Sequence, residues 1–419
     1  MKRLLSAITT PTAKSSTFYY FSSVFSSFFR YLFHLILLRL LVPAEYGEFL
    51  SYLSLVYILG IPTIVISNVV TKYVADYRGK DDLVSINKLF YFLVNKISVL
   101  TIPFGSLLII FSQPLAVIFK AHYIAFIVLG VSVFISVFQV IISSYIFAFQ
   151  KIIFQTIIGF VSVIVTIVLS VVSIKLGYGA TGVISAQILT GVLMTVISFL
   201  YIKSSVYPKI IDGKVLNFNI SNFVGYSFIY ALGTSLLVST DILMVRIFFD
   251  SHTSGLYSSL SMLGRMILFG LSPLITLVFP IAAHRHAKKV KTNSTFFKLG
   301  LVIFIFGIGA ASLFSLFPTL VINLFSGVAY IESASWLHYV VFSMAFFAFS
   351  QFIISFLMAT DQAWVNVFLL VATILQPIII FVFRGSISSV IIGNFVLQIG
   401  LFLVLVYILS AKIFSRDLK

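Results

Sequence analysis

The chain has 419 residues, of which 60% are hydrophobic and only 9% are charged. A soluble domain is nearer half apolar and a quarter charged, so the composition excludes an ordinary soluble protein and indicates an integral membrane protein. The net charge of +16 could suggest nucleic-acid binding. Because the basic residues gather in loops on one side of the predicted spans, we expect no nucleic-acid partner. The absence of cysteine excludes disulfides, thiolate metal sites and cysteine nucleophiles.

Apolar runs of about 20 residues, long enough to cross the hydrocarbon core as helices, recur along the chain. Barrel strands are about half that length and alternate in polarity, so the runs predict helices. Before Pro11 there is no apolar stretch of signal-peptide type, and we expect no cleaved signal. The predicted spans are 17–41, 46–71, 88–111, 122–148, 152–174, 179–202, 222–249, 254–282, 297–322, 333–359, 363–383 and 387–411. This pattern predicts an all-α polytopic protein with twelve transmembrane helices.

Twelve spans put both termini on one side of the membrane. Twenty Lys and Arg residues then lie in or beside the loops on that side, whereas the opposite loops hold Arg39, Lys120, Lys175 and Arg384. By the positive-inside rule the termini are predicted to be cytoplasmic. No loop is long enough for a soluble catalytic domain, so we expect a protein that is not an enzyme.

The second half of the chain echoes the first. Arg39 and Arg246 are 207 residues apart, and Gly47 and Gly255 are 208 residues apart. Leu53-Ser54 recurs as Leu260-Ser261, and Ala75…Arg78 as Ala282…Arg285. Several matches at offsets of 207 to 208 residues predict two related halves: a six-helix lobe at 1–202, a cytoplasmic connection at 203–221 and a second six-helix lobe at 222–419.

Four local patterns resemble the polysaccharide-transporter branch of the multidrug/oligosaccharidyl-lipid/polysaccharide (MOP) exporter superfamily, the Wzx-type O-antigen flippases, which are MATE-like. They run in the family's order over nearly the whole chain, although Val42 stands where glycine is usual. The patterns are Arg39-Leu-Leu-Val-Pro-Ala-Glu-Tyr-Gly, Tyr73-Val-Ala-Asp-Tyr-Arg-Gly-Lys-Asp81, Gly177-Tyr-Gly-Ala-Thr-Gly182, and Asp241-Ile-Leu-Met-Val-Arg-Ile-Phe-Phe followed by Gly255-Leu-Tyr.

The resemblance implies a twelve-helix, two-lobed fold around a central cavity. It also implies translocation of an undecaprenyl-diphosphate-linked oligosaccharide, such as an O-antigen repeat unit, from the cytoplasmic to the periplasmic leaflet. The protein is then expected in the bacterial inner membrane, with a lipid-linked oligosaccharide and membrane lipids as partners, and in contact with other membrane proteins of polysaccharide assembly.

Ionisable residues at membrane depth are costly and usually face a cavity or a partner. Arg30 and His34 are four residues apart in the first span, so they share a helix face. With Arg246 and Arg265 they predict a cationic substrate site, because the arginine fork donates paired hydrogen bonds to a diphosphate. The alternative is that arginines near the interface snorkel, and Arg39 is expected to be such an anchor.

Asp241 has two open interpretations. It could couple transport to H⁺ or Na⁺, or it could form a salt bridge with Arg246. We expect no metal site and no other cofactor.

Two other functions stay open. A multidrug or cation exporter of the same superfamily would need buried carboxylates, and only Asp241 is a candidate. A membrane glycosyltransferase or polymerase of the same pathway would need a sizeable periplasmic loop, which the predicted topology lacks.

Overall fold

A computed structural model describes residues 28–80, 82–206, 222–288 and 293–417. Among these residues all regular structure is helical, which confirms the predicted all-α membrane fold. The start of the first predicted span and residues 207–221 of the predicted connection lie outside the described residues.

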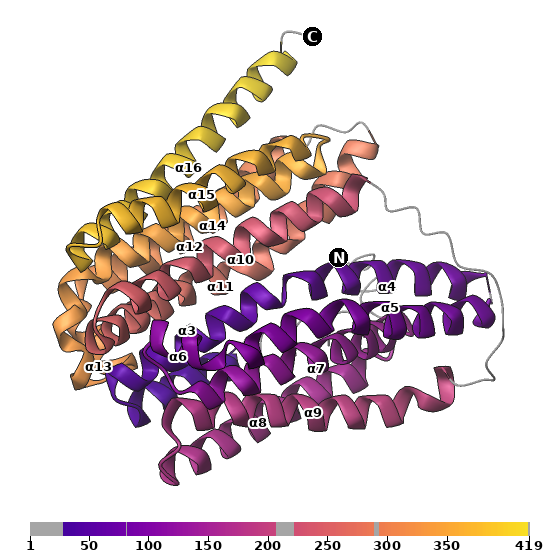
Figure 1. Cartoon of the computed structure of the whole chain (residues 1–419). Coiled ribbons are helices and arrows are strands. Elements are labelled where there is room, and N and C mark those ends of the chain that lie inside the picture. The colour runs from indigo at the N-terminus through magenta and orange to yellow at the C-terminus, as the bar shows by residue number, and fades with distance from the viewer. Residues whose placement is uncertain (1–27, 81, 207–221, 289–292, 418–419) are drawn as a thin grey trace, which may run out of the picture. The chain divides into compact units, whose positions relative to one another are not determined.

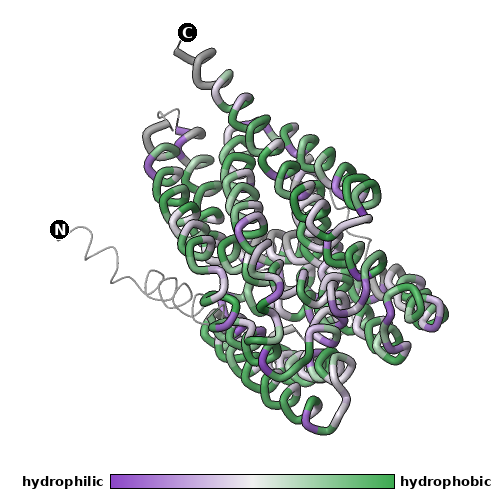
Figure 2. Tube along the Cα trace, turned by 90° about the vertical axis from the view of Figure 1, so that its left-hand side faces the viewer, coloured by the Kyte–Doolittle hydropathy of each residue, from purple (hydrophilic) through white to green (hydrophobic). Residues whose placement is uncertain are grey.

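Nine helices of the described part are long and apolar enough to cross a membrane, or ten when the bent pair Thr101–Ile110 and Ser112–Ile118 counts as one span. The nine coincide with the predicted spans from 122–148 onward. Apolar residues cover the greater part of these helices (Figure 2). Run length and composition were therefore sufficient to locate them.

The chain divides into two compact units. Unit 1 comprises residues 1–40 and 59–221, and unit 2 comprises residues 41–58 and 222–419. In unit 1 a helix over residues 28–40 is followed by α4 Ile61–Gly79, α5 Leu83–Ile110, α6 Ser112–Ile118, α7 Tyr123–Ala148, α8 Ile152–Lys175 and α9 Gly179–Val206. Unit 2 contains α3 Pro43–Leu59, whose last residue belongs to unit 1, then α10 Asn222–Phe248, α11 Ser251–Ala287, α12 Asn293–Leu316, α13 Pro318–Phe325, η1 Val328–Trp336, α14 Leu337–Ala359, η2 Ala363–Val365, α15 Asn366–Val382 and α16 Ile387–Asp417 (Figure 1).

Two predicted helices are broken in the structure. The span predicted at 46–71 is wrong as one helix, because α3 ends at Leu59 and α4 begins at Ile61. Pro62 lies in the first turn of α4, where proline is favoured because that position needs no N–H donor. Likewise the residues predicted as one span at 297–322 belong to two helices. The first, α12, ends at Leu316, and Pro318 begins the separate short helix α13.

Helix pairing inside the two units follows one scheme. In unit 1, α4, α5 and α9 pack on α7, and α8 packs on α9. In unit 2, α11, α12 and α16 pack on α14, and α15 packs on α16. Each unit also places a short helix, α6 or α13, directly after its α5 or α12. The repeated order supports the duplication that the sequence echo predicts.

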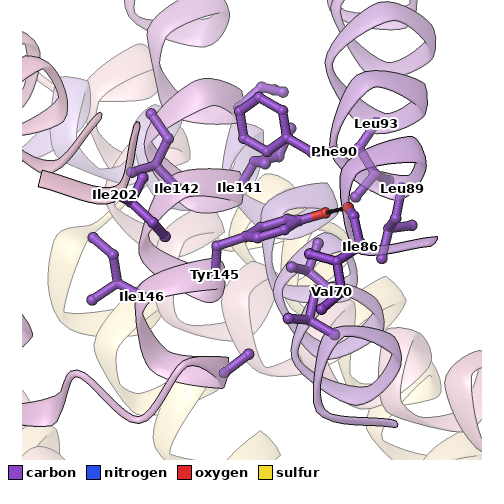
Figure 3. Close-up of a cluster of buried hydrophobic side chains, with 13 residues drawn as sticks. Val70, Ile86, Leu89, Phe90, Leu93, Ile141, Ile142, Tyr145, Ile146 and Ile202 are labelled. Carbon is purple, nitrogen blue, oxygen red and sulfur yellow. Dashed lines mark hydrogen bonds between the residues drawn. The ribbon is translucent and has the colours of Figure 1, made fainter. Parts of the chain in front are cut away.

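Unit 1 contains a cluster of buried hydrophobic side chains (Figure 3). It is built by side chains of α4, α5, α7 and α9 around Tyr145, whose ring packs edge-on against Phe90. The Tyr145 hydroxyl donates to the Ile86 carbonyl at 3.0 Å, so its one polar atom is satisfied. The buried residues of this cluster are Val70, Val74, Ile86, Leu89, Phe90, Leu93, Val137, Ile141, Ile142, Tyr145, Ile146, Ala148 and Ile202.

Glycine permits one close helix approach in each unit. In unit 1 a Cβ on Gly130 would stand 2.7 Å from the Gly105 carbonyl oxygen. In unit 2 a Cβ on Gly255 would stand 1.9 Å from the carbonyl oxygen of Pro43, and a Cβ on Gly47 would stand 2.9 Å from the Gly255 backbone. Small residues let membrane helices pack backbone to backbone. The sequence-related pair Gly47 and Gly255 is therefore in direct contact where α3 begins.

Two aspartates outside the spans cap helices. Asp82 precedes α5 and accepts from the Ser85 amide at 2.9 Å, and Asp250 precedes α11 and accepts from the Thr253 amide at 3.0 Å. The Ser85 hydroxyl and amide lower the pKa of Asp82, and the hydrogen bonds from Thr253 lower the pKa of Asp250. Both carboxylates therefore stabilise helix starts as anions.

Candidate functional site

The first predicted site residues lie on the helix over residues 28–40 of unit 1. Arg30 is exposed, whereas His34 is buried, with 8% of its surface accessible. The His34 ring packs edge-on against Phe33, with 5.6 Å between centroids. The helical backbone agrees with the predicted common face of Arg30 and His34. Their role in substrate binding stays a prediction.

Unit 2 contains a group of buried polar side chains that we call the polar core: Asp241, Tyr257, Arg265, Gln376, Asn394 and Gln398. Its carboxylate, Asp241, is 2% exposed and comes from α10. From α11, the Tyr257 hydroxyl donates to Oδ2 of Asp241 at 2.7 Å. Asn394 of α16 lies near the same tyrosine, and both polar atoms of its side chain are buried without a hydrogen-bond partner among the described residues. Buried ionisable groups in membrane helices are rare and usually functional, so this group is the strongest candidate site inside unit 2.

Arg265 brings a positive charge to the polar core. Its side chain is 1% exposed, and its Nη2 donates to the Val238 carbonyl of α10. Val238 precedes Asp241 by three residues, which places both on one side of α10. Arg265 also interacts electrostatically with Asp241. The cation beside Asp241 is thus Arg265, rather than the Arg246 that the salt-bridge interpretation named.

The last two spanning helices contribute neutral groups. Gln376 of α15 donates from Nε2 to the Leu237 carbonyl at 3.0 Å, which ties α15 to α10. Gln398 and Asn394 are four residues apart on α16, and both are buried. Several buried oxygens of the polar core, including Oδ1 of Asp241 and Oδ1 of Asn394, have no hydrogen-bond partner among the described residues. Such atoms are exceptional in packed interiors, which adds to the reasons for treating the polar core as a candidate site.

Arg246 belongs to a different contact of unit 2. It is 1% exposed, and its Nη1 donates to the Ala44 carbonyl at the start of α3 at 3.2 Å. It also interacts electrostatically with Glu48 and Tyr52, and the Tyr52 hydroxyl donates to Glu48. Near this contact the Tyr330 hydroxyl donates to the Leu41 carbonyl at 3.3 Å. Arg246 therefore holds the first turn of α3 within unit 2.

The neutral members of the polar core were not predicted from the sequence. Tyr257 lies two helical turns before Arg265 and so shares its face. Asn394 and Gln398 form an i, i+4 amide pair inside an apolar run, which was a usable signal. Within the described residues no group of three or more His, Cys, Asp or Glu side chains is placed to hold a metal ion.

Comparison with known proteins shows the fold. The chain is similar to the inward-facing structure of a multidrug resistance MATE family transporter of the MOP superfamily, with 15% identity, a TM-score of 0.69, and coverage of 92% of this chain and 95% of that one. It is also similar to the inward closed structure of the lipid II flippase MurJ, with 14% identity, a TM-score of 0.71, and coverage of 94% and 87%. An outward-facing MATE transporter matches with 16% identity, a TM-score of 0.57, and coverage of 92% and 93%. No protein-family model and no curated protein sequence matches the chain. The chain therefore has the fold shared by these MATE transporters and by the lipid II flippase MurJ.

Proposed function

We propose that the protein is a flippase for an undecaprenyl-diphosphate-linked oligosaccharide. It moves the lipid from the cytoplasmic to the periplasmic leaflet of the bacterial inner membrane by alternating access, with both termini cytoplasmic. The fold supports a transporter or flippase rather than an enzyme, and one protein of this fold is named for lipid II, a lipid-linked substrate. An O-antigen repeat unit, or a related glycan, is the substrate that the sequence resemblance favours.

The observation that carries this proposal is the exposed arginine on the first described helix. Arg30 combines a permanent charge with an exposed side chain on a helix that continues into the apolar sequence. Of the predicted phosphate ligands, Arg246 and Arg265 donate to backbone carbonyls of unit 2 and are 1% exposed. We therefore assign the diphosphate contact to Arg30, with His34 as its neighbour one turn later.

A multidrug or cation exporter is the second candidate, because the MATE transporters share the fold. Such a protein would bind cationic substrates with carboxylates. In unit 2 the buried carboxylate Asp241 already faces Arg265 and Tyr257. This arrangement favours the lipid-diphosphate substrate over an organic cation.

Replacement of Arg30 in a strain that lacks the native copy tests the proposal. Arg30→Ala should abolish export of surface polysaccharide, because the diphosphate loses its cation, and Arg30→Lys should retain part of it. Arg39→Ala is the matched control: Arg39 is an exposed arginine on the same helix, and we predict that it is an interfacial anchor. Wild-type export by Arg30→Ala, at normal protein levels, would reject the assignment.

A further inference from the structure

Two side chains of α11 reach the same stretch of α10. Tyr257 donates to Asp241 at 2.7 Å, and Arg265, two turns farther along α11, donates to the Val238 carbonyl. Residues eight apart lie on one helix face, so α11 presents a hydroxyl and a guanidinium together. The carboxylate of Asp241 therefore has a neutral donor and a fixed cation supplied by one neighbouring helix.

Both charges are removed from the surface, since Arg265 is 1% exposed and Asp241 is 2% exposed. A charge buried alone is strongly unfavourable, whereas two opposite charges with further hydrogen bonds compensate each other. Arginine keeps its proton even when buried, so its charge is permanent. Within the polar core the buried carboxylate and the buried guanidinium thus offset each other's charge.

We propose that Arg265 is the resident cation of unit 2. Its guanidinium takes the place beside Asp241 that a free monovalent cation or a proton would take in a cation-driven carrier. Consequently, neither a free monovalent cation nor a proton binds at Asp241 during the transport cycle. The inference rests on the proposed transport function, but it concerns ion binding, which can be measured without the lipid substrate.

Removal of the guanidinium should create a cation site. The groups left behind would be the Asp241 carboxylate, the Tyr257 hydroxyl, the Val238 carbonyl and the Asn394 amide oxygen. Two of their oxygens, Oδ1 of Asp241 and Oδ1 of Asn394, are buried and have no hydrogen-bond partner among the described residues. Oxygen ligands of this kind suit hard cations such as Na⁺.

The test measures the melting temperature of the purified full-length protein in detergent, with NaCl replaced stepwise by choline chloride at constant ionic strength. The wild type should not respond to Na⁺. Arg265→Gln should show a saturable rise in Tm with Na⁺, because an ion that binds only the folded state stabilises it. The double variant Asp241→Asn with Arg265→Gln should lose that rise.

Arg384→Gln is the matched control, because it removes one positive charge from unit 2 at a residue that stacks on Phe381 at 4.3 Å instead of facing the polar core. The Tm of Arg384→Gln should not respond to Na⁺, as in the wild type. Absence of a Na⁺ response in folded Arg265→Gln would overturn the proposal, and so would a Na⁺ response that survives in the double variant.

A comparison of the wild type with Asp241→Asn keeps the proposal testable if Arg265→Gln does not fold. A Na⁺-dependent Tm in the wild type that Asp241→Asn abolishes would overturn it. An infrared band of a protonated carboxyl group that disappears in Asp241→Asn would also overturn the proposal. Absence of that band, together with a Tm that does not depend on Na⁺, would support Arg265 as the resident cation. None of these readouts depends on whether the transported lipid is the one proposed.

Discussion

The two units share a helix pairing scheme but differ in what fills their interiors. In unit 1, α4, α5, α7 and α9 enclose aliphatic and aromatic side chains, and the Tyr145 hydroxyl is tied to one carbonyl. In unit 2, α10, α11, α15 and α16 contribute the polar core, with Asp241 and Arg265 both nearly inaccessible. Unit 2 therefore buries a carboxylate and a guanidinium, whereas the apolar cluster described in unit 1 holds no charged side chain.

The largest difference between the interiors should come from removing the buried cation that interacts electrostatically with Asp241. Arg265→Met leaves Asp241 buried without its cation and should cost about 3–5 kcal/mol of unfolding free energy. The double variant with Asp241→Leu should recover much of this loss, since a buried pair replaced by apolar side chains is often tolerated. Thermal unfolding of both variants in detergent provides the measurement. Equal losses in the single and double variants would show that Arg265 and Asp241 do not compensate each other.

A cavity in the apolar core should be the next largest effect. Ile141 is fully buried in unit 1, and Ile141→Ala should cost about 2–5 kcal/mol through lost contacts and the void left behind. Ile153, which is 59% exposed on α8, provides the control, and Ile153→Ala should leave the unfolding midpoint nearly unchanged. Similar destabilisation by the two variants would contradict the packing described for unit 1.

The close approach at the start of α3 predicts a smaller loss. In Gly255→Ala the new methyl group meets the Pro43 carbonyl oxygen, so we expect a cost of about 1–3 kcal/mol as the backbone shifts. Gly270 lies on the same helix, and a methyl group added there would meet nothing within 4 Å, so Gly270→Ala should be neutral or slightly stabilising. The pair compares one substitution at two positions of α11 by thermal unfolding. Equal losses at the two glycines would contradict the close approach.

The smallest expected effects come from removing the hydroxyl groups of two buried tyrosines, Tyr145 and Tyr257. Tyr145→Phe removes a hydrogen bond to a neutral carbonyl and should cost about 0.5–1.5 kcal/mol, whereas Tyr257→Phe removes one to a carboxylate and should cost about 1.5–3 kcal/mol. Denaturation of both variants under one set of conditions gives the difference. The reverse order would mean that Asp241 is not ionised in the folded protein.

Within the described residues, the apolar runs predicted the positions of nine helices that are long and apolar enough to cross a membrane, because run length and hydropathy report directly on burial in lipid. They did not predict the break between α3 and α4, since Gly60 and Pro62 lie inside an apolar run that reads as one helix. Nor could they assign residues 41–58 to unit 2, because that depends on contacts with Gly255, Arg246 and Tyr330, which are remote in the sequence.

The partner of Asp241 could not be predicted from the sequence either, because it also depends on a contact between residues that are remote in the sequence. Spacing along one helix offered Arg246, five residues away, but the structure places Arg265 of α11 beside the carboxylate. Intrahelical spacing follows from the sequence, whereas the facing residue of a neighbouring helix depends on rotation and register. The candidate residues could thus be named from the sequence, but their pairing could not.

Reconstituted vesicles test the proposed lipid transport most directly. Purified wild-type protein and Arg30→Ala are incorporated into proteoliposomes that carry an undecaprenyl-diphosphate-linked oligosaccharide, and the fraction of the lipid reaching the opposite leaflet is followed over time. We predict transfer by the wild type and a rate at least about tenfold lower for Arg30→Ala, the loss expected when one charge-assisted contact to the diphosphate is removed. Equal rates for the two proteins, or no transfer by the wild type above protein-free vesicles, would contradict the account.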